Sequence, residues 1–269
     1  MNSSPVIMGI LNVTPDSFSD GGRFNGTDIA VSHAINMANA GAGIIDVGGE
    51  STRPGSDRVS AQEQIARVGD VIRACRQRLP QSVHISIDTT RAEVAEYVLD
   101  AGADIVNDVS AGRDDPDMFQ LVVDRQCPCV LMHMLGTPKI MQDDPHYDDV
   151  VYDVKRFLLD RAEAALQAGI ADHNIILDPG IGFGKTREHN LQLLQGLAEL
   201  AATGFQILLG ASRKRFMGSL CEETSTDNLV AATCATTALG VMAGVKYFRV
   251  HDVRENHQAA IVAWAIKNS

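Results

Sequence analysis

The chain has 269 residues, a usual length for an α/β barrel of one domain. Apolar residues make up 45% of it, enough for a large core, and its net charge of −11 argues against nonspecific nucleic-acid binding. No apolar run approaches the roughly 18 residues of a membrane helix, and the N-terminus lacks signal-peptide features. The five cysteines form no C-x-x-C pair, so we expect reduced thiols in a cytoplasmic protein without nucleic-acid or membrane partners.

Eight short apolar runs alternate with segments of helical period along the chain. The runs span residues 6–13, 43–49, 83–89, 104–110, 128–134, 174–180, 206–212 and 247–253. Most are almost continuously apolar, as in parallel strands that are buried on both faces. Helices are indicated by the 3.6-residue period of 148–168 and by capping boxes at 60–63 and 90–93. No linker interrupts the pattern, which predicts one domain, residues 1–269, folded as a (β/α)8 TIM barrel.

One motif, LDPGIGFGKT at residues 177–186, needs a separate explanation. It ends in Gly-Lys-Thr like a phosphate-binding P-loop, but the first glycine of that motif would fall at Pro179. Proline has no N–H to offer to a phosphate. We therefore interpret the stretch as a glycine-rich loop that follows Asp178 and lets flat ligands approach, with Lys185 and Thr186 beginning the next helix.

Polar side chains end most of the predicted strands. Active sites of such barrels lie at the C-terminal ends of the strands, so we expect these side chains to meet there. One group mixes acceptors with a donor and suits a flat heterocycle with an amino–imine edge: Asp88, Asn107, Asp178 and Lys214. A second group suits an oxyanion such as a phosphate: Asn12, Thr52, Arg53, Arg249 and His251.

Several of these positions have a purely structural alternative. An acid at a strand end, such as Asp88, could be the N-cap of a helix. Asp46 and Asp108 could bind backbone N–H groups of loops, and His133 could be a satisfied core histidine. The connections 14–26 and 135–147 are unusually long, which is typical of functional lids.

The motifs, taken together, resemble the dihydropteroate synthase family. They lie in order at 8–22, 46–55, 86–89, 107–112, 132–142, 177–185, 212–216 and 249–253. The resemblance implies that 6-hydroxymethyl-7,8-dihydropterin diphosphate and 4-aminobenzoate are condensed to 7,8-dihydropteroate and pyrophosphate, in folate biosynthesis. It also implies Mg²⁺ as cofactor, a homodimer, and inhibition by sulfonamides. Leu135 stands where many relatives have glutamine.

The resemblance further implies roles for individual residues. The pterin contacts would be Asp88, Asn107, Met132, Asp178 and Lys214, and Asn12 would bind the magnesium ion. The diphosphate contacts would be Thr52, Arg249 and His251. The aminobenzoate pocket would contain Thr52, Arg53, Pro54, Phe183 and Ser212. The loops 14–26 and 50–59 would close over the substrates.

A dissociative displacement is the mechanism that we expect. Asp88 and Asp178 would stabilise a cationic pterin, while Arg249, His251 and Mg²⁺ stabilise the leaving oxygens, with Lys214 as the fifth catalytic group. Three alternatives remain open. A pterin-binding methyltransferase barrel would not need the Ser-Thr-Arg-Pro-Gly loop at 51–55, a Schiff-base aldolase would use Lys214 as its nucleophile, and a non-catalytic pterin or phosphate binder would turn nothing over.

Overall fold

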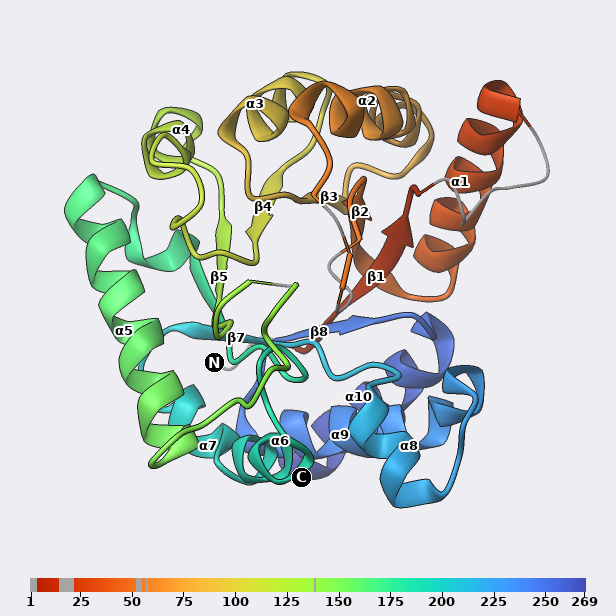
Figure 1. Cartoon of the computed structure of the whole chain (residues 1–269). Helices are drawn as coiled ribbons and strands as arrows, with labels where there is room; N and C mark the ends of the chain where they lie inside the picture. Colours follow the sequence, from red (N-terminus) through yellow and green to blue (C-terminus); the bar gives the residue numbers. More distant parts are fainter. Residues whose placement is uncertain (1–3, 15–21, 52–54, 57, 138) are drawn as a thin grey trace.

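The computed structural model describes residues 4–14, 22–51, 55–56, 58–137 and 139–269, and its centre is a closed barrel of eight parallel strands (Figure 1). The strands pair in chain order, and the last closes on the first. They are β1 Val6–Asn12, β2 Ala42–Gly48, β3 His84–Asp88, β4 Ile105–Asp108, β5 Cys129–Met132, β6 Ile175–Asp178, β7 Gln206–Leu209 and β8 Tyr247–Val250. Each coincides with one predicted run, so the (β/α)8 prediction is confirmed.

Helices surround the barrel on all sides (Figure 1). They are α1 Gly22–Asn39, α2 Ala61–Arg78, α3 Ala92–Asp100, α4 Met118–Arg125, α5 Val150–Ala168, α6 Arg187–Gln195, α7 Leu197–Ala201, α8 Arg215–Cys221, α9 Val230–Ala243 and α10 Val253–Lys267, with the short 3-10 helices η2 Asp172–Asn174 and η3 Thr226–Leu229. The helix predicted over 148–168 is α5. No helix in the described part of the chain is long and apolar enough to span a membrane.

One of the two predicted capping boxes is confirmed at its N-cap and the other is wrong. Ser60 caps α2, because its side chain accepts a hydrogen bond from the backbone of Glu63. At the start of α3 the Thr90 side chain caps nothing: the N-cap position is Arg91, and Asp115 accepts the Ala92 N–H at 2.8 Å. The Asp115 carboxylate, from the loop after β4, therefore accepts a hydrogen bond from an N–H group in the first turn of α3, as a capping side chain would have done.

The strands alternate between two faces, and this alternation positions the site. Inside the barrel an apolar layer is formed by Met8, Ile44, Ile105, Val130, Ile176 and Leu208. Two residues further along a strand, the next side chain on the same face points into the barrel again. That step leads from Ile44 to Asp46, from Ile105 to Asn107 and from Ile176 to Asp178. The polar layer therefore lies directly above the apolar one, towards the C-terminal ends of the strands.

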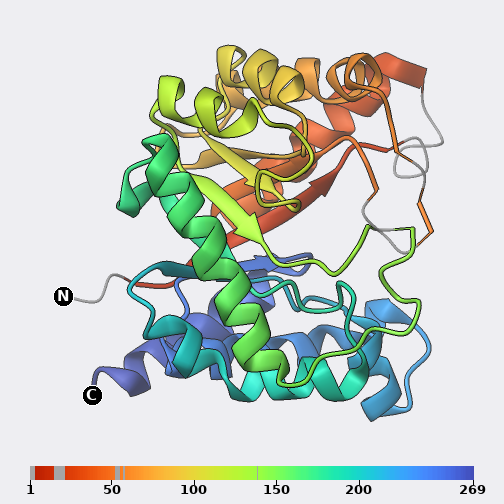
Figure 2. The same cartoon turned by 60° about the vertical axis from the view of Figure 1, so that its left-hand side comes forward.

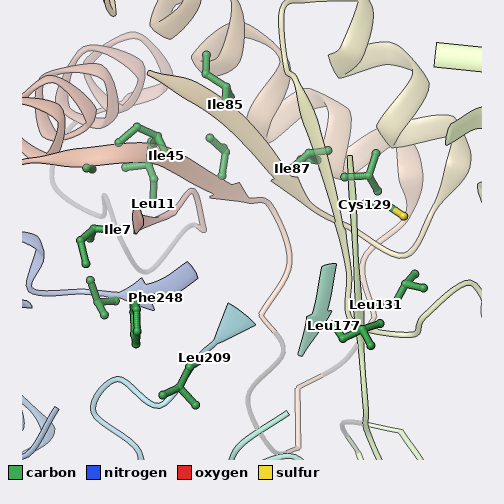
Figure 3. Close-up of a cluster of buried hydrophobic side chains, with 14 of the residues drawn as sticks. Ile7, Leu11, Ile45, Ile85, Ile87, Cys129, Leu131, Leu177, Leu209 and Phe248 are labelled. Carbon is green, nitrogen blue, oxygen red and sulfur yellow. The ribbon is translucent and has the colours of Figure 1, made fainter. Parts of the chain in front are cut away.

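The other face of the strands packs against the helices. Figure 3 shows Ile45, Ile85, Leu131, Leu177 and Phe248 among the buried side chains of this outer layer. All five are at most 1% exposed. This packing fixes the strands, so the opposite, inward-facing residues are held in defined positions.

The predicted long connection after β5 spans 133–149 and contacts the loop after β6. Gln142 donates from Nε2 to the Gly182 carbonyl at 2.8 Å, and the Tyr147 hydroxyl donates to the Gly184 carbonyl at 2.7 Å. In Figure 2 this connection lies at the end of the barrel away from the C-terminus. The first long connection is shorter than predicted because α1 begins at Gly22; its residues 15–21 lie outside the described residues.

Candidate active site

Arg249 lies at the centre of the polar layer and joins three strands. Its Nε donates to Asp46 Oδ2 at 2.6 Å, and its Nη2 donates to Asp88 Oδ2 at 2.8 Å. Asn107 donates from Nδ2 to the same Asp46 oxygen at 3.2 Å. The acids on β2 and β3, the amide on β4 and the cation on β8 thus form one network at the mouth of the barrel.

The network contains more buried charge than a packed core would tolerate without pairing. Burial alone would lower the pKa of Arg249, but the carboxylates of Asp46 and Asp88 outweigh it and its pKa is raised. Burial raises the pKa of Asp88 to about 7, against the opposing charge of Arg249. Asp88 is therefore no helix cap: it is a buried acid poised between its neutral and charged forms, a common property of functional groups.

Asp178 faces the same mouth from β6. Its Oδ1 accepts the Gly180 N–H at 2.7 Å, and burial raises its pKa to about 6. A Cβ added at Gly210 would lie 3.6 Å from Asp178 Oδ2 and 4.0 Å from the Cβ of Arg249, so these two side chains flank one point. Oδ2 accepts no hydrogen bond from the described residues and is available for a ligand.

Lys214 and Phe183 form the next part of the wall. The Lys214 ammonium lies 4.1 Å from the centre of the Phe183 ring, a cation–π contact. Burial lowers the pKa of Lys214 to about 8, and Asp178 and Asp88 act in the opposite direction. Phe183 also packs on an apolar cluster that includes Met132. A flat ligand beside Asp178 would therefore find an ammonium group and an apolar surface close together.

His251 and Ser212 hold each other at the ends of β8 and β7. Ser212 Oγ lies 3.0 Å from His251 Nδ1, and the backbone N–H of His251 donates to the same oxygen. Burial lowers the pKa of His251 to about 4, so the ring is neutral at pH 7. When the Ser212 hydroxyl donates to Nδ1, the neutral ring carries its proton at Nε2. His251 thus offers one neutral donor.

Asn12 ends β1 beside Asp88. Asn12 Oδ1 and Asp88 Oδ2 both lie within 4 Å of the point that a Cβ at Gly48 would occupy. The Asn12 Oδ1 atom is an oxygen ligand of the kind that suits Mg²⁺, which is held by one or two protein oxygens and by substrate phosphates. No group of three His, Cys, Asp or Glu side chains suited to a metal occurs in the described ranges. An ion here would depend on substrate oxygens.

The expected aminobenzoate residues Thr52, Arg53 and Pro54 lie outside the described residues. The base of their loop is defined by Glu50, whose Oε1 accepts the Val59 N–H at 3.2 Å and whose Oε2 accepts from Gln64 at 2.6 Å. Both ends of the 50–59 loop are thereby tied to the start of α2.

Of the three other residues that were given a structural alternative, Asp108 and His133 follow it and Asp46 does not. Asp108 does bind loop N–H groups, from Ser110 and Gly112, as the structural alternative predicts. Asp46 instead pairs with Arg249, which its position two residues after the inward-facing Ile44 could have indicated. His133 is 5% exposed and bonded to Lys185, so it is a satisfied core histidine.

Two glycines of the 177–186 motif make room for the loop that follows β5. Gly180 has a φ of +65°, and a Cβ there would overlap the carbonyl oxygen of His133. Gly184 has a φ of +63°, with Leu135 2.6 Å from an added Cβ. Gly180 and Gly184 therefore admit the neighbouring loop, and their part in ligand approach stays a prediction. Thr186 is the N-cap of α6, as predicted, but Lys185 points back into its own loop.

The comparisons with known proteins agree with this geometry. Residues 8–251 match the pterin binding enzyme family, which defines the class of protein. The chain is 44% identical to dihydropteroate synthase of Synechocystis over 97% of this chain and 89% of that one. It superimposes with a TM-score of 0.93 and 43% identity on the Yersinia pestis dihydropteroate synthase solved with a sulfonamide drug, covering 100% and 96% of the two chains. With the Xanthomonas albilineans dihydropteroate synthase solved with 4-aminobenzoic acid, the TM-score is 0.92 and the sequence identity 42%, over 99% of this chain and 94% of that one. The chain belongs to the dihydropteroate synthase family.

Proposed function

We propose that the chain joins 6-hydroxymethyl-7,8-dihydropterin diphosphate to 4-aminobenzoate, forming 7,8-dihydropteroate and pyrophosphate in folate biosynthesis. The observation that carries this proposal is the contact of Arg249 with both Asp46 and Asp88, in the same mouth as Asp178. The acceptor expected to bind the heterocycle, Asp88, is thus hydrogen-bonded directly to the cation expected to bind its leaving group, Arg249. Relatives solved with 4-aminobenzoic acid and with a sulfonamide drug support the choice of second substrate and of inhibitor class.

The reaction proceeds by a dissociative displacement. The bond between the pterin methylene and the diphosphate oxygen breaks first, and the electron pair leaves with the oxygen. The amine lone pair of aminobenzoate then forms the new C–N bond, and its proton passes to solvent or to pyrophosphate. An aromatic amine is neutral at pH 7, so the reaction needs no strong base. The barrier lies in separating charge, and fixed charges in the site lower it.

Each described site residue has a part in that separation. Asp178 accepts from the pterin and stabilises the cationic ring, together with Asp88. Lys214 donates to the pterin, Met132 supplies an apolar contact to it, and the Phe183 ring beside Lys214 lies on the aminobenzoate side. Arg249 and the Nε2–H of His251 bind the departing oxygens, since a guanidinium binds a diphosphate through paired donors. Mg²⁺, held by Asn12, would supply Lewis-acid stabilisation of the phosphoryl oxygens when bound.

We also propose that the protein is a cytoplasmic homodimer. The face of α9 and α10 carries Leu239, Met242, Val262 and Ile266, all between 48% and 63% exposed. They line or border one apolar groove between the two helices. An exposed apolar patch of this kind suits a second copy of the same surface, paired about a two-fold axis. The five free thiols support a reducing compartment.

The proposed activity is tested by omission. Pyrophosphate release is measured with pterin diphosphate, 4-aminobenzoate and Mg²⁺ together and with each left out in turn. The proposal requires release that depends on all three. Methyl transfer from a methyl-pterin, or trapping of Lys214 by borohydride with a carbonyl substrate, would favour the methyltransferase or the aldolase instead.

A further inference from the structure

Lys185 is a buried ammonium group beside the site that the proposed mechanism does not use. It is 4% exposed, and its Nζ lies 2.9 Å from each of three acceptors: the carbonyls of Gly180 and Phe183 and the Nδ1 atom of His133. An ammonium group has three protons, so these acceptors satisfy it completely. Within the described ranges no ion pair includes it. The group is therefore bound to backbone and imidazole, not to a carboxylate.

Such a group is expensive to bury. Burial lowers the pKa of Lys185 to about 7, with Asp178 opposing the effect. The same burial lowers the pKa of His133 to about 2, so this ring is neutral and acts as an acceptor. An apolar side chain of equal length would fill the space without this desolvation cost. Packing alone therefore does not account for a lysine at this position.

The loop that Lys185 closes lacks stiffness of its own. Gly180, Gly182 and Gly184 all have positive φ, and glycine gains most freedom of all residues when it is released from such a conformation. Lys185 connects the two ends of the turn, since it binds the Gly180 and Phe183 carbonyls at once. The Phe183 N–H also donates to Gly180 O at 3.1 Å. The hydrogen bonds of Lys185 thus hold in one conformation a loop whose glycines alone would leave it flexible.

The loop also carries a group of the site. The Phe183 ring lies under the Lys214 ammonium and in the apolar cluster with Met132 and Met134. The third partner of Lys185, His133, stands between these two methionines in the chain. Lys185 therefore fixes the position of Phe183 relative to β5, while Asp88 and Asn107 are held by other strands.

We propose that Lys185 is a positioning residue that locks the 180–184 loop, and with it the Phe183 ring, into the geometry that the aminobenzoate side of the site requires. This inference rests on the proposed function. Lys185 touches neither substrate and acts through the backbone of Phe183.

Steady-state kinetics of the full chain test this role. Lys185→Met should raise the KM for 4-aminobenzoate about tenfold, the typical effect of losing charge-assisted hydrogen bonds, and should change the KM for pterin diphosphate far less. In a Phe183→Ala background the same change should add little, because both changes act through one ring. Lys155→Met, which removes an α5 lysine that pairs with Glu199, is the matched control and should behave as wild type.

A measurement without catalysis separates this inference from the proposed function. Hydrogen–deuterium exchange of the peptide covering 180–184 should be at least about tenfold faster in Lys185→Met, with α9 unchanged. Should the methionine variant fail to fold, Lys185→Gln, which keeps a donor, takes its place. Equal increases in both KM values, additive effects with Phe183→Ala, or unchanged exchange would overturn the proposal. Faster exchange in Lys185→Met, together with a wild-type chain that releases no pyrophosphate, would support the loop role and reject the enzyme activity.

Discussion

Arg249 Nη2 lies 2.8 Å from Asp88 Oδ2, so the residue expected to hold the leaving group is bonded to one expected to hold the ring. The two halves of the site are therefore not separate regions. A pterin that binds Asp88 and a diphosphate that binds Arg249 would therefore each contact one member of this pair. Asp46, which is fully buried, anchors Arg249 through a second ion pair.

Arg249→Ala should weaken binding of dihydropterin diphosphate much more than binding of the free hydroxymethyl pterin. The diphosphate loses a paired donor, whereas the pterin is affected only through the altered charge of Asp88. Calorimetric titration with the two ligands measures the difference. Equal losses would show that Arg249 does not distinguish the leaving group.

Asp46→Asn should lower both stability and turnover. A buried guanidinium would lose its fully buried partner, and breaking such a pair typically costs roughly 3 kcal/mol in the free energy of unfolding. Denaturant unfolding and kcat/KM for pterin diphosphate measure the two effects. Asp227→Asn, which removes an exposed partner of Arg213, is the control and should change neither. Wild-type stability of Asp46→Asn would refute the anchoring role.

Asp178→Asn should lower kcat by roughly 10²-fold or more, the usual loss when one electrostatic contact to a transition state is removed. The asparagine retains the size of the side chain and an acceptor oxygen, so binding of the ground state should change less than turnover does. Stopped-flow or steady-state rates at saturating substrates give the value. A variant that turns over like wild type would exclude stabilisation of a cation by Asp178.

The pH dependence of kcat/KM for pterin diphosphate, at saturating 4-aminobenzoate, should be bell-shaped. The two carboxyl groups stabilise a cationic pterin only when they are ionised, so activity should rise as pH increases through the raised pKa values of Asp178, about 6, and Asp88, about 7. Lys214 carries its positive charge only when it is protonated, so activity should fall above its lowered pKa, about 8. Lys214→Arg keeps its charge and should remove the alkaline limb. If the alkaline limb were unchanged in Lys214→Arg, the loss of activity at high pH would have to come from another group.

The α9–α10 face should hold two copies together. Leu239→Glu combined with Val262→Glu should convert the dimer to a monomer, because each places charge in an apolar interface. Light scattering after gel filtration gives the mass of each species. Ile29→Glu, at an exposed apolar position on α1, is the control and should leave the dimer intact. A wild-type monomer would contradict the proposed dimer.

Much of this architecture can be predicted from the sequence, because it depends on the spacing of apolar residues and on the position of polar residues at the ends of strands. The eight apolar runs gave the eight strands, and the polar residues that end them gave Asp88, Asn107, Asp178, Lys214, Arg249 and His251. These residues meet because the C-terminal ends of all barrel strands lie on one side. Strand order therefore follows from the alternating pattern without any knowledge of pairing.

Other features depend on contacts between distant segments and leave no local signal. The Thr90 cap is replaced by Asp115, 25 residues further along the chain. Lys185 resembles the end of a P-loop or the start of a helix, and only the approach of His133 from β5 shows why it is buried. Asp46 resembles a loop-binding acid until Arg249 from β8 is placed beside it. In each case a long-range partner outweighs the local preference.

The central claim is that one barrel mouth holds a pterin and its leaving group and delivers the exposed methylene to an amine. The ratio of dihydropteroate formed to pyrophosphate released, measured in the same reaction with Mg²⁺ present, tests it most directly. We predict one product molecule for each pyrophosphate, with little release when aminobenzoate is absent. Pyrophosphate released at the same rate without aminobenzoate, or release with no dihydropteroate formed, would contradict the account.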